Sequence, residues 1–179
     1  EILIGLVGSE MCIRDSISPD MLGICIGGAL KNVIALAAGI ADGLGYGDNT
    51  KAALITRGIA EISRLGTAMG ANPSTFSGLS GIGDLIVTCA SMHSRNNRAG
   101  ILIGKGKSPE QAVKEVGMVV EGINALPAAM ELAAKYNVEM PIVQTVNAIV
   151  KEGMSASDAL RTLMDRNRKN EMPQGYEKV

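Results

Sequence analysis

A long apolar stretch with a single charge at its centre constrains how this chain can fold. The segment from Met21 to Ala41 reads MLGICIGGALKNVIALAAGIA, and Lys31 is its only charged residue. The stretch is long enough to cross a bilayer, but a central lysine opposes insertion by roughly 2.5–3.5 kcal/mol. We therefore expect a buried helix of a folded domain and no membrane span. A lysine there either performs chemistry in a cavity or extends its amine to water along apolar surface.

The composition narrows the class of protein. The 179 residues are enough for one domain, and 17 basic against 18 acidic residues give a net charge of −1. With no basic field and few aromatic rings for stacking bases, we expect no nucleic-acid partner. Three scattered cysteines, Cys12, Cys25 and Cys89, indicate a reducing compartment and so a cytoplasmic location. A single histidine, with neither CxxC nor HExxH, predicts no metal site.

Helical patterns follow one another along the chain, and no strand–GxGxxG–helix unit of the nucleotide-binding kind occurs. We therefore predict an all-α fold with one helical domain over residues 20–166 and a polar tail at 167–179. Glycines, prolines and capping residues place the expected helices at residues 28–44, 50–69, 94–103, 108–116, 123–136, 141–151 and 155–166. A glycine-spaced turn covers residues 77–84, and a connector covers 118–122.

The first sixteen residues have a different character from the rest. Their sequence, EILIGLVGSEMCIRDS, resembles a translated adapter sequence of the kind that recurs in front of unrelated proteins in assembled reads. It lacks the basic start and the small-residue cleavage site of a signal peptide. We interpret residues 1–16 as a non-native leader and base no functional inference on them.

Polar residues on two segments could share a cavity with Lys31. Asn32, its neighbour, belongs either to a site or to an ordinary helix hydrogen bond. Asp84 follows the glycine-spaced turn and could pair with the lysine, although capping of the next helix alone is the simpler interpretation. Thr88 lies four residues later on the same helix face, either as a site residue or as a plain helix-face hydroxyl.

A third segment has the pattern of an anion-binding helix start. Ser94, Arg95 and Asn96 fall at an expected N-terminus, where free N–H groups and a guanidinium favour phosphate. The alternative is an ordinary capped surface helix. Of the nearby titratable residues, His93 is interpreted as a loop residue, and Glu121 is either a site residue or an exposed turn carboxylate.

Taken together, four strings resemble the C-terminal domain of bacterial NAD(P)-dependent glycerol-3-phosphate dehydrogenase. They are GGALKNVIALAAGIADGLG, GLSGIGDLIVTC, the SRN that Gly100 follows, and VVEG. The resemblance covers about Asp20 to Asp165. It implies a multi-helix substrate domain of the 6-phosphogluconate-dehydrogenase-like type. The family's N-terminal Rossmann domain, with its glycine-rich loop, is not in this sequence.

The resemblance also implies roles for individual residues. Lys31 would donate and accept the proton in the interconversion of glycerone phosphate and sn-glycerol 3-phosphate, which supplies the backbone of phospholipids. The residues implied to bind substrate are Lys31, Asn32, Asp84, Thr88, Ser94, Arg95 and Asn96. Those implied to approach NAD or NADP are Arg95, Val119 and Glu121. Gly27 and Gly28 would let the backbone lie close to the ligand.

Two other functions stay open on the sequence alone. One is a non-catalytic helical module that binds phosphate esters or dimerises, and the other is the helical domain of another 3-hydroxyacid dehydrogenase. The expected partner is a small-molecule phosphate substrate, and a homodimer is left open. Because most of the cofactor site would lie on the Rossmann domain, we expect the 179-residue chain alone to be inactive.

Overall fold

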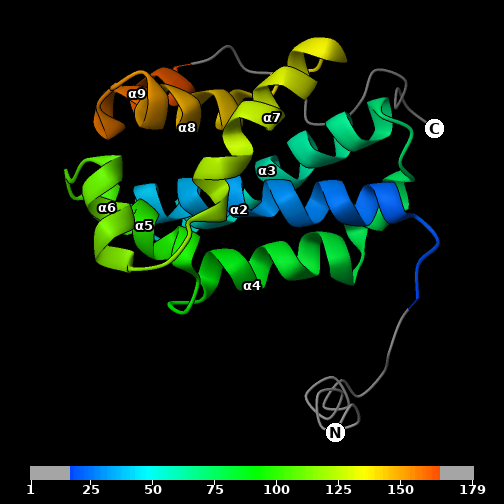
Figure 1. Cartoon of the computed structure of the whole chain (residues 1–179), viewed down its shortest axis with the longest axis horizontal. Helices are drawn as coiled ribbons and strands as arrows, with labels where there is room; N and C mark the ends of the chain where they lie inside the picture. Colours follow the sequence, from blue (N-terminus) through cyan, green and yellow to red (C-terminus); the bar gives the residue numbers. More distant parts are fainter. Residues whose placement is uncertain (1–16, 166–179) are drawn as a thin grey trace, which may run out of the picture.

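The computed structural model describes residues 17–165, and in this part of the chain there are helices and no β-strand (Figure 1). The α-helices are α2 (Met21–Gly43), α3 (Asp48–Ala68), α4 (Asp84–Ala90), α5 (Arg95–Gly104), α6 (Pro109–Val116), α7 (Glu121–Lys135), α8 (Pro141–Lys151) and α9 (Ala156–Met164). A 3₁₀ turn, η1 (Pro73–Ser77), and a π turn, η2 (Leu79–Gly83), join α3 to α4. The predicted all-α class is confirmed. The predicted leader at 1–16 and tail at 167–179 lie outside the described residues.

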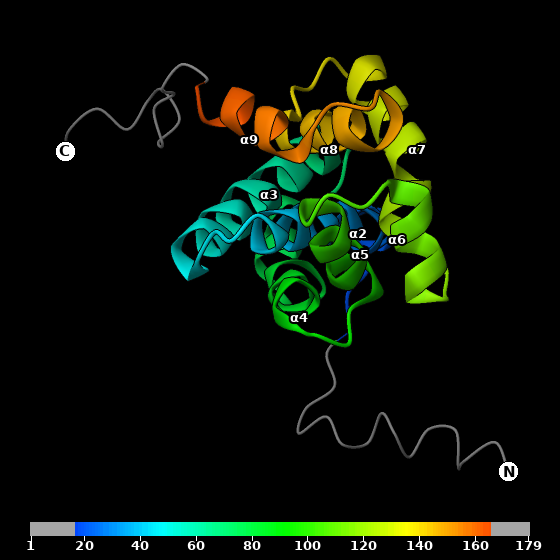
Figure 2. The ribbon, with the colours of Figure 1, turned by 90° about the vertical axis from the view of Figure 1, so that its left-hand side faces the viewer.

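Helix α2 is the core of the domain. It contacts α3, α4, α5, α7 and α8, with α8 and α9 on one side of the molecule and α4 on the opposite side (Figures 1 and 2). By length and hydropathy α2 could cross a membrane, but 72% of its most apolar stretch is buried inside the structure. Its apolar surface is therefore covered by neighbouring helices, as expected for a core helix.

Helix α2 begins at Met21, earlier than the predicted start at residue 28, because Asp20 caps it. One carboxylate oxygen accepts a hydrogen bond from the Gly23 N–H at 2.9 Å. The other accepts from the Asn72 N–H at 2.9 Å and from the Thr75 hydroxyl at 2.6 Å. The bond from Thr75 is the largest cause that holds the pKa of Asp20 below its ordinary value. These contacts tie the start of α2 to the η1 turn.

Helices α2 and α5 pack backbone against backbone through glycines four residues apart. These are Gly39 and Gly43 on α2, and Gly100 and Gly104 on α5. A Cβ on Gly100 would lie 2.3 Å from the carbonyl oxygen of Leu36, and one on any of the others would meet the facing backbone at 2.1–2.3 Å. No larger residue fits there without moving a helix. The contact therefore fixes the start of α5 beside the middle of α2.

A buried carboxylate joins α3 to α8. Glu61 is 3% exposed, and its two oxygens accept from the Ile142 N–H at 2.9 and 3.1 Å, with the Val143 N–H 3.4 Å away. The first N–H groups of a helix have no acceptor within it, and the helix N-terminus favours negative charge. Glu61 therefore caps α8 from a different helix.

We expect Gly100→Ala to lower the free energy of unfolding by at least about 1–3 kcal/mol, the usual cost of overpacking. The added Cβ would meet a backbone oxygen at 2.3 Å, and urea denaturation followed by circular dichroism measures the loss. Gly83→Ala is the matched control, because its φ is −61° and its Cβ would come no closer than 3.7 Å to a neighbour. Equal stability of the two variants would contradict the close contact.

We expect the Asp20→Asn variant to have a lower melting temperature than the parent chain at neutral pH. The difference between the two melting temperatures should shrink in acid. The pKa of Asp20 in the folded chain lies below its ordinary value of 3.8. The charged form therefore stabilises the fold above that value, and the contribution is lost as the pH falls through the folded pKa. Thermal unfolding measured from neutral to acid pH tests this, and a difference that stays constant would argue against it.

Candidate active site

A cleft of about 470 Å³ opens between the middle of α2, the end of α4 and the first turns of α5 and α7. Its lining residues are Gly28, Lys31, Asn32, Val87, Thr88, Ser91, His93, Ser94, Arg95, Asn96 and Glu121. All but one of the residues predicted to bind substrate line this cleft, and the exception, Asp84, contacts a residue that does. A second cavity, of about 20 Å³ and largely apolar, lies between α2, α3, α8 and α9 and is too small for a substrate.

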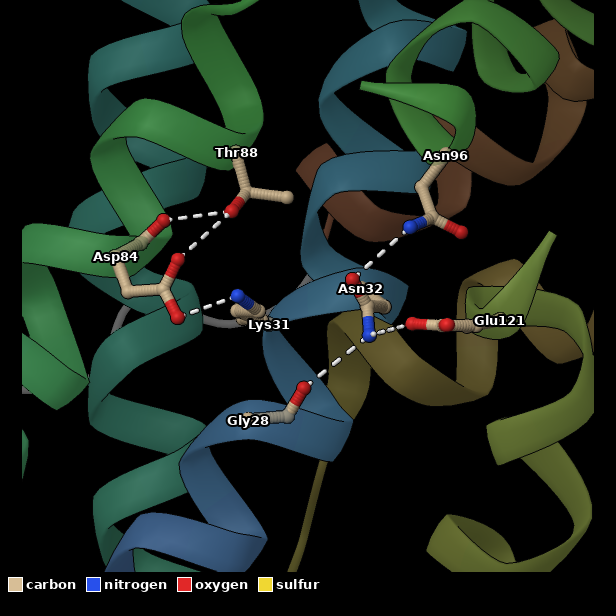
Figure 3. A network of polar contacts seen from close by, with 7 residues as sticks. All are labelled: Gly28, Lys31, Asn32, Asp84, Thr88, Asn96 and Glu121. Atoms are coloured by element: carbon tan, nitrogen blue, oxygen red, sulfur yellow. Dashed lines mark hydrogen bonds and ion pairs between the residues drawn. The ribbon is translucent and has the colours of Figure 1, made fainter. Parts of the chain in front are cut away.

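Lys31 reaches the cleft from α2 and forms an ion pair with Asp84 of α4 (Figure 3). The Thr88 hydroxyl lies one turn further along α4, 2.7 Å from the Asp84 carbonyl oxygen and 3.2 Å from its Oδ1. The Lys31 and Asp84 side chains are 23% and 39% exposed. The amine is held by a carboxylate and still open to the cleft, which is the arrangement that a proton donor needs.

The interpretation of Asp84 as only a helix cap is wrong. The capping position of α4 is Gly83, and no side chain bonds there. The π turn η2 runs directly into α4, and the Asp84 N–H already donates to the carbonyls of Leu79 and Gly81. Its carboxylate is therefore not needed at the helix end and points to Lys31. Single π turns of this kind are frequent at functional sites.

The first turn of α5 offers a surface for an anion. The Ser94 hydroxyl caps the helix by accepting from the Asn97 N–H at 3.3 Å. The N–H groups of Arg95 and Asn96 precede that of Asn97 in the first turn, and they have no carbonyl partner within the helix. Together with the positive end of the helix dipole and the Arg95 guanidinium, they favour a phosphate group.

Glu121 is exposed, as one interpretation had it, but it is the first residue of α7 and does not lie in a turn. Helix α7 begins before the predicted start at residue 123, and the connector ends at Val120. One Glu121 oxygen accepts from the Asn32 amide at 3.1 Å, and the other lies 3.5 Å from the Arg95 guanidinium. The Glu121 side chain is 54% exposed, so the contact with Arg95 is weak and leaves the guanidinium available to a ligand.

Several cleft residues were not anticipated from the sequence. Ser91 and His93 lie between α4 and α5 and line the cleft, although His93 was interpreted as an ordinary loop residue. The signal that could have found them is their position between two predicted site segments. Val119, predicted at the cofactor, is exposed on the connector before α7 and outside the lining. Within residues 17–165, no group of three or more His, Cys, Asp or Glu could hold a metal ion.

The fold and the cleft define an all-α domain in which an ion-paired lysine faces an anion-favouring helix start. Residues 20–161 match the family model described as NAD-dependent glycerol-3-phosphate dehydrogenase C-terminus. The chain belongs to this family, and the resemblance found in the sequence is confirmed.

Named relatives agree with the family model. The chain is 67% identical over 155 residues to glycerol-3-phosphate dehydrogenase (NAD(P)+) of Fusobacterium nucleatum, covering 87% of this chain and 46% of the relative. It is 60% identical to the protein of that name in Bacillus subtilis, covering 87% and 45%. The solved structure of glycerol-3-phosphate dehydrogenase from Coxiella burnetii superposes with a TM-score of 0.81 at 34% identity, covering 90% of this chain and 52% of that one. The chain thus spans about half the length of its relatives.

Two adjacent glycines of α2 differ in a way that tests the cleft. A Cβ on Gly28 would meet nothing within 4 Å, whereas one on Gly27 would lie 3.3 Å from the Ser80 carbonyl oxygen. A glycine inside a helix costs roughly 0.5–1 kcal/mol relative to alanine. Gly28→Ala should therefore raise the free energy of unfolding by about that amount, and Gly27→Ala should not. Urea denaturation that found Gly27→Ala the more stable variant would contradict the open cleft beside Gly28.

Proposed function

We propose that this chain is the substrate-binding and catalytic half of a dehydrogenase that interconverts sn-glycerol 3-phosphate and glycerone phosphate. The observation that carries the proposal is that the Lys31 amine and the start of α5 line one cleft of about 470 Å³. A three-carbon phosphate ester needs both groups, one at its reacting carbon and one at its phosphate. The names of relatives that are 60% and 67% identical support the same activity.

In the proposed reaction Lys31 handles the proton. During reduction, negative charge develops on the carbonyl oxygen of glycerone phosphate. The Lys31 ammonium stabilises this charge and donates the proton that forms the alcohol, and the neutral amine takes the proton back in the reverse direction. Asp84 orients the amine through their ion pair, and the Thr88 hydroxyl, 3.2 Å from Oδ1, orients Asp84.

The phosphate of the substrate would lie at the first turn of α5. The backbone N–H groups of Arg95 and Asn96, the Ser94 side chain and the Arg95 guanidinium supply donors and positive charge there. Asn32 lies next to Lys31 and lines the same cleft. Binding energy gained at the phosphate, away from the reacting carbon, fixes the orientation of the carbonyl toward the lysine.

Two cleft residues, Arg95 and Glu121, and Val119 just before α7 have side chains that suit a dinucleotide. The Arg95 guanidinium is 36% exposed and can pair with a phosphate, the Glu121 carboxylate can accept from a ribose hydroxyl, and Val119 is 58% exposed and apolar. We therefore propose that Arg95, Val119 and Glu121 contact NAD or NADP. When bound, the nicotinamide would supply the hydride for reduction and accept it in oxidation.

In a cell, this activity would supply the glycerol phosphate backbone of phospholipids, and we propose a cytoplasmic location with a small phosphate ester as partner. The chain spans about half the length of its relatives and has no glycine-rich dinucleotide loop. We therefore propose that the 179-residue chain has no turnover by itself. Its activity is best tested in a chimera in which residues 20–161 replace the matching region of the Fusobacterium nucleatum relative.

In this chimera, Lys31→Met should lower kcat by about 10²–10⁴-fold, the usual contribution of a positioned proton donor. The change keeps the length and apolar stem of the side chain but removes the ammonium. The oxidation of NADH by glycerone phosphate measures the loss. Lys107→Met is the control, because Lys107 pairs with Glu115 on the surface and does not line the cleft; it should keep parental turnover.

A parent chimera without turnover would overturn the dehydrogenase proposal. Calorimetry with sn-glycerol 3-phosphate on the 179-residue chain then separates the remaining functions. Binding that is lost in Arg95→Ala would favour a phosphate-ester-binding module. No binding at all would leave only a scaffold.

A further inference from the structure

Three helices meet at a chain of hydrogen-bonded amide groups beside the cleft (Figure 3). The Asn32 Nδ2 donates to the Gly28 carbonyl at 3.2 Å and to Glu121 Oε2 at 3.1 Å. The Asn96 Nδ2 donates to Asn32 Oδ1 at 2.9 Å. The Gly122 N–H donates to Asn96 Oδ1 at 2.8 Å. The amide chain thus joins α2, α5 and the start of α7.

The two ends of the amide chain set its direction. The Glu121 carboxylate can only accept, and the Gly122 N–H can only donate. Rotating either asparagine amide by about 180° exchanges its Oδ1 and Nδ2. Oxygen would then face oxygen on one neighbour, and N–H would face N–H on the other. Each amide therefore has one favourable orientation, and that of Asn32 depends on Asn96.

Burial makes this dependence strong. Asn96 is 5% exposed and Asn32 is 7% exposed, so water does not readily replace a lost partner. Gly122 closes the chain, because a Cβ there would lie 2.5 Å from the Asn32 carbonyl oxygen and 3.1 Å from Asn96 Oδ1. The amide of Asn96 is thus enclosed by α2 and α7, while the residue itself still lines the cleft at the first turn of α5.

We infer that the side chain of Asn96 is a positioning residue for the reaction, apart from any contact that its backbone N–H makes with substrate. Its Nδ2 holds Asn32, the neighbour of Lys31, in one orientation. Its Oδ1 holds the start of α7 and with it the Glu121 carboxylate. The effect on turnover rests on the proposed function, whereas the orientation of the amides is measurable without it.

Asn96→Asp tests the direction of the hydrogen bonds in the amide chain. The new carboxylate can still accept from the Gly122 N–H, but it faces Asn32 Oδ1 with a second acceptor. In the chimera, kcat should fall on the order of a hundredfold, as for other small misplacements of reacting groups. The loss should be the same with glycerone phosphate and with unphosphorylated dihydroxyacetone. An unchanged kcat, or a rise only in the KM for glycerone phosphate, would overturn the inference.

A second substitution should reverse the direction and restore part of the activity. Adding Glu121→Gln to Asn96→Asp gives position 121 a side-chain N–H donor. The Asn32 amide can then rotate by about 180°, so that its Oδ1 accepts from this donor and its Nδ2 donates to the carboxylate at position 96. The bond from Asn32 to the Gly28 carbonyl is not restored, so we expect a regain of about tenfold out of the hundredfold loss. No regain in the double variant would overturn the inference.

Exchange of side-chain amide protons provides a readout in the 179-residue chain itself. By NMR, the Asn32 amide protons should exchange slowly in the parent, because both have acceptors, and fast in Asn96→Asp. Asn97→Ala is the matched control: Asn97 is 1% exposed on the same helix and donates to the Cys89 carbonyl at 3.0 Å. It should lower stability without speeding the exchange of Asn32.

The two proposals fail in different ways. Fast exchange of the Asn32 amide in the parent would overturn the positioning role. A parent chimera without turnover would overturn only the dehydrogenase function, and the exchange experiment would then decide the role of Asn96. If Asn96→Asp does not fold, Asn96→Ser carries the same expectations for kcat and for amide exchange, since it removes the Nδ2 donor without adding charge.

Discussion

The backbone contact between α2 and α5 is the constraint on which the site depends. Four glycines let the two helices approach so closely that any Cβ would meet facing backbone at 2.1–2.3 Å. Because α5 is one continuous helix from its first turn to this contact, the anion-favouring end of α5 lies beside the middle of α2. A larger residue at any of the four positions would separate the anion-favouring end of α5 from Lys31 without touching either.

Charged side chains from different helices pair at the cleft. Lys31 pairs with Asp84, so its largely buried amine has a compensating carboxylate, whereas Arg95 makes only a weak contact with Glu121. Each partner comes from a different helix, and each pair keeps enough exposure to be rearranged by a ligand. The same polar contacts that hold the helices in place therefore also orient the groups proposed to act on substrate.

The sequence predicted helix boundaries well where the capping and proline signals are local. Ser108 forms the capping box expected for α6, and Pro141 starts α8 as its position indicated. The start of α2 was placed too late, although its cap is local, because Asp20 accepts from the Gly23 N–H three residues further on. The further contacts of Asp20 with Asn72 and Thr75 lie far along the chain, so no local pattern could show them.

By itself, the sequence determined the helical class, the burial of α2 and which residues are chemically able to act, because periodicity and side-chain type are local properties. Only the tertiary structure decided how those residues are used. It pairs Lys31 with a carboxylate 53 positions away and turns Asn96 toward an amide 64 positions away. It also places Glu61 on the start of α8, 81 positions away. Helix packing determines such partners, because hydrogen bonds and ion pairs form between groups that are close in space, whatever their separation along the chain.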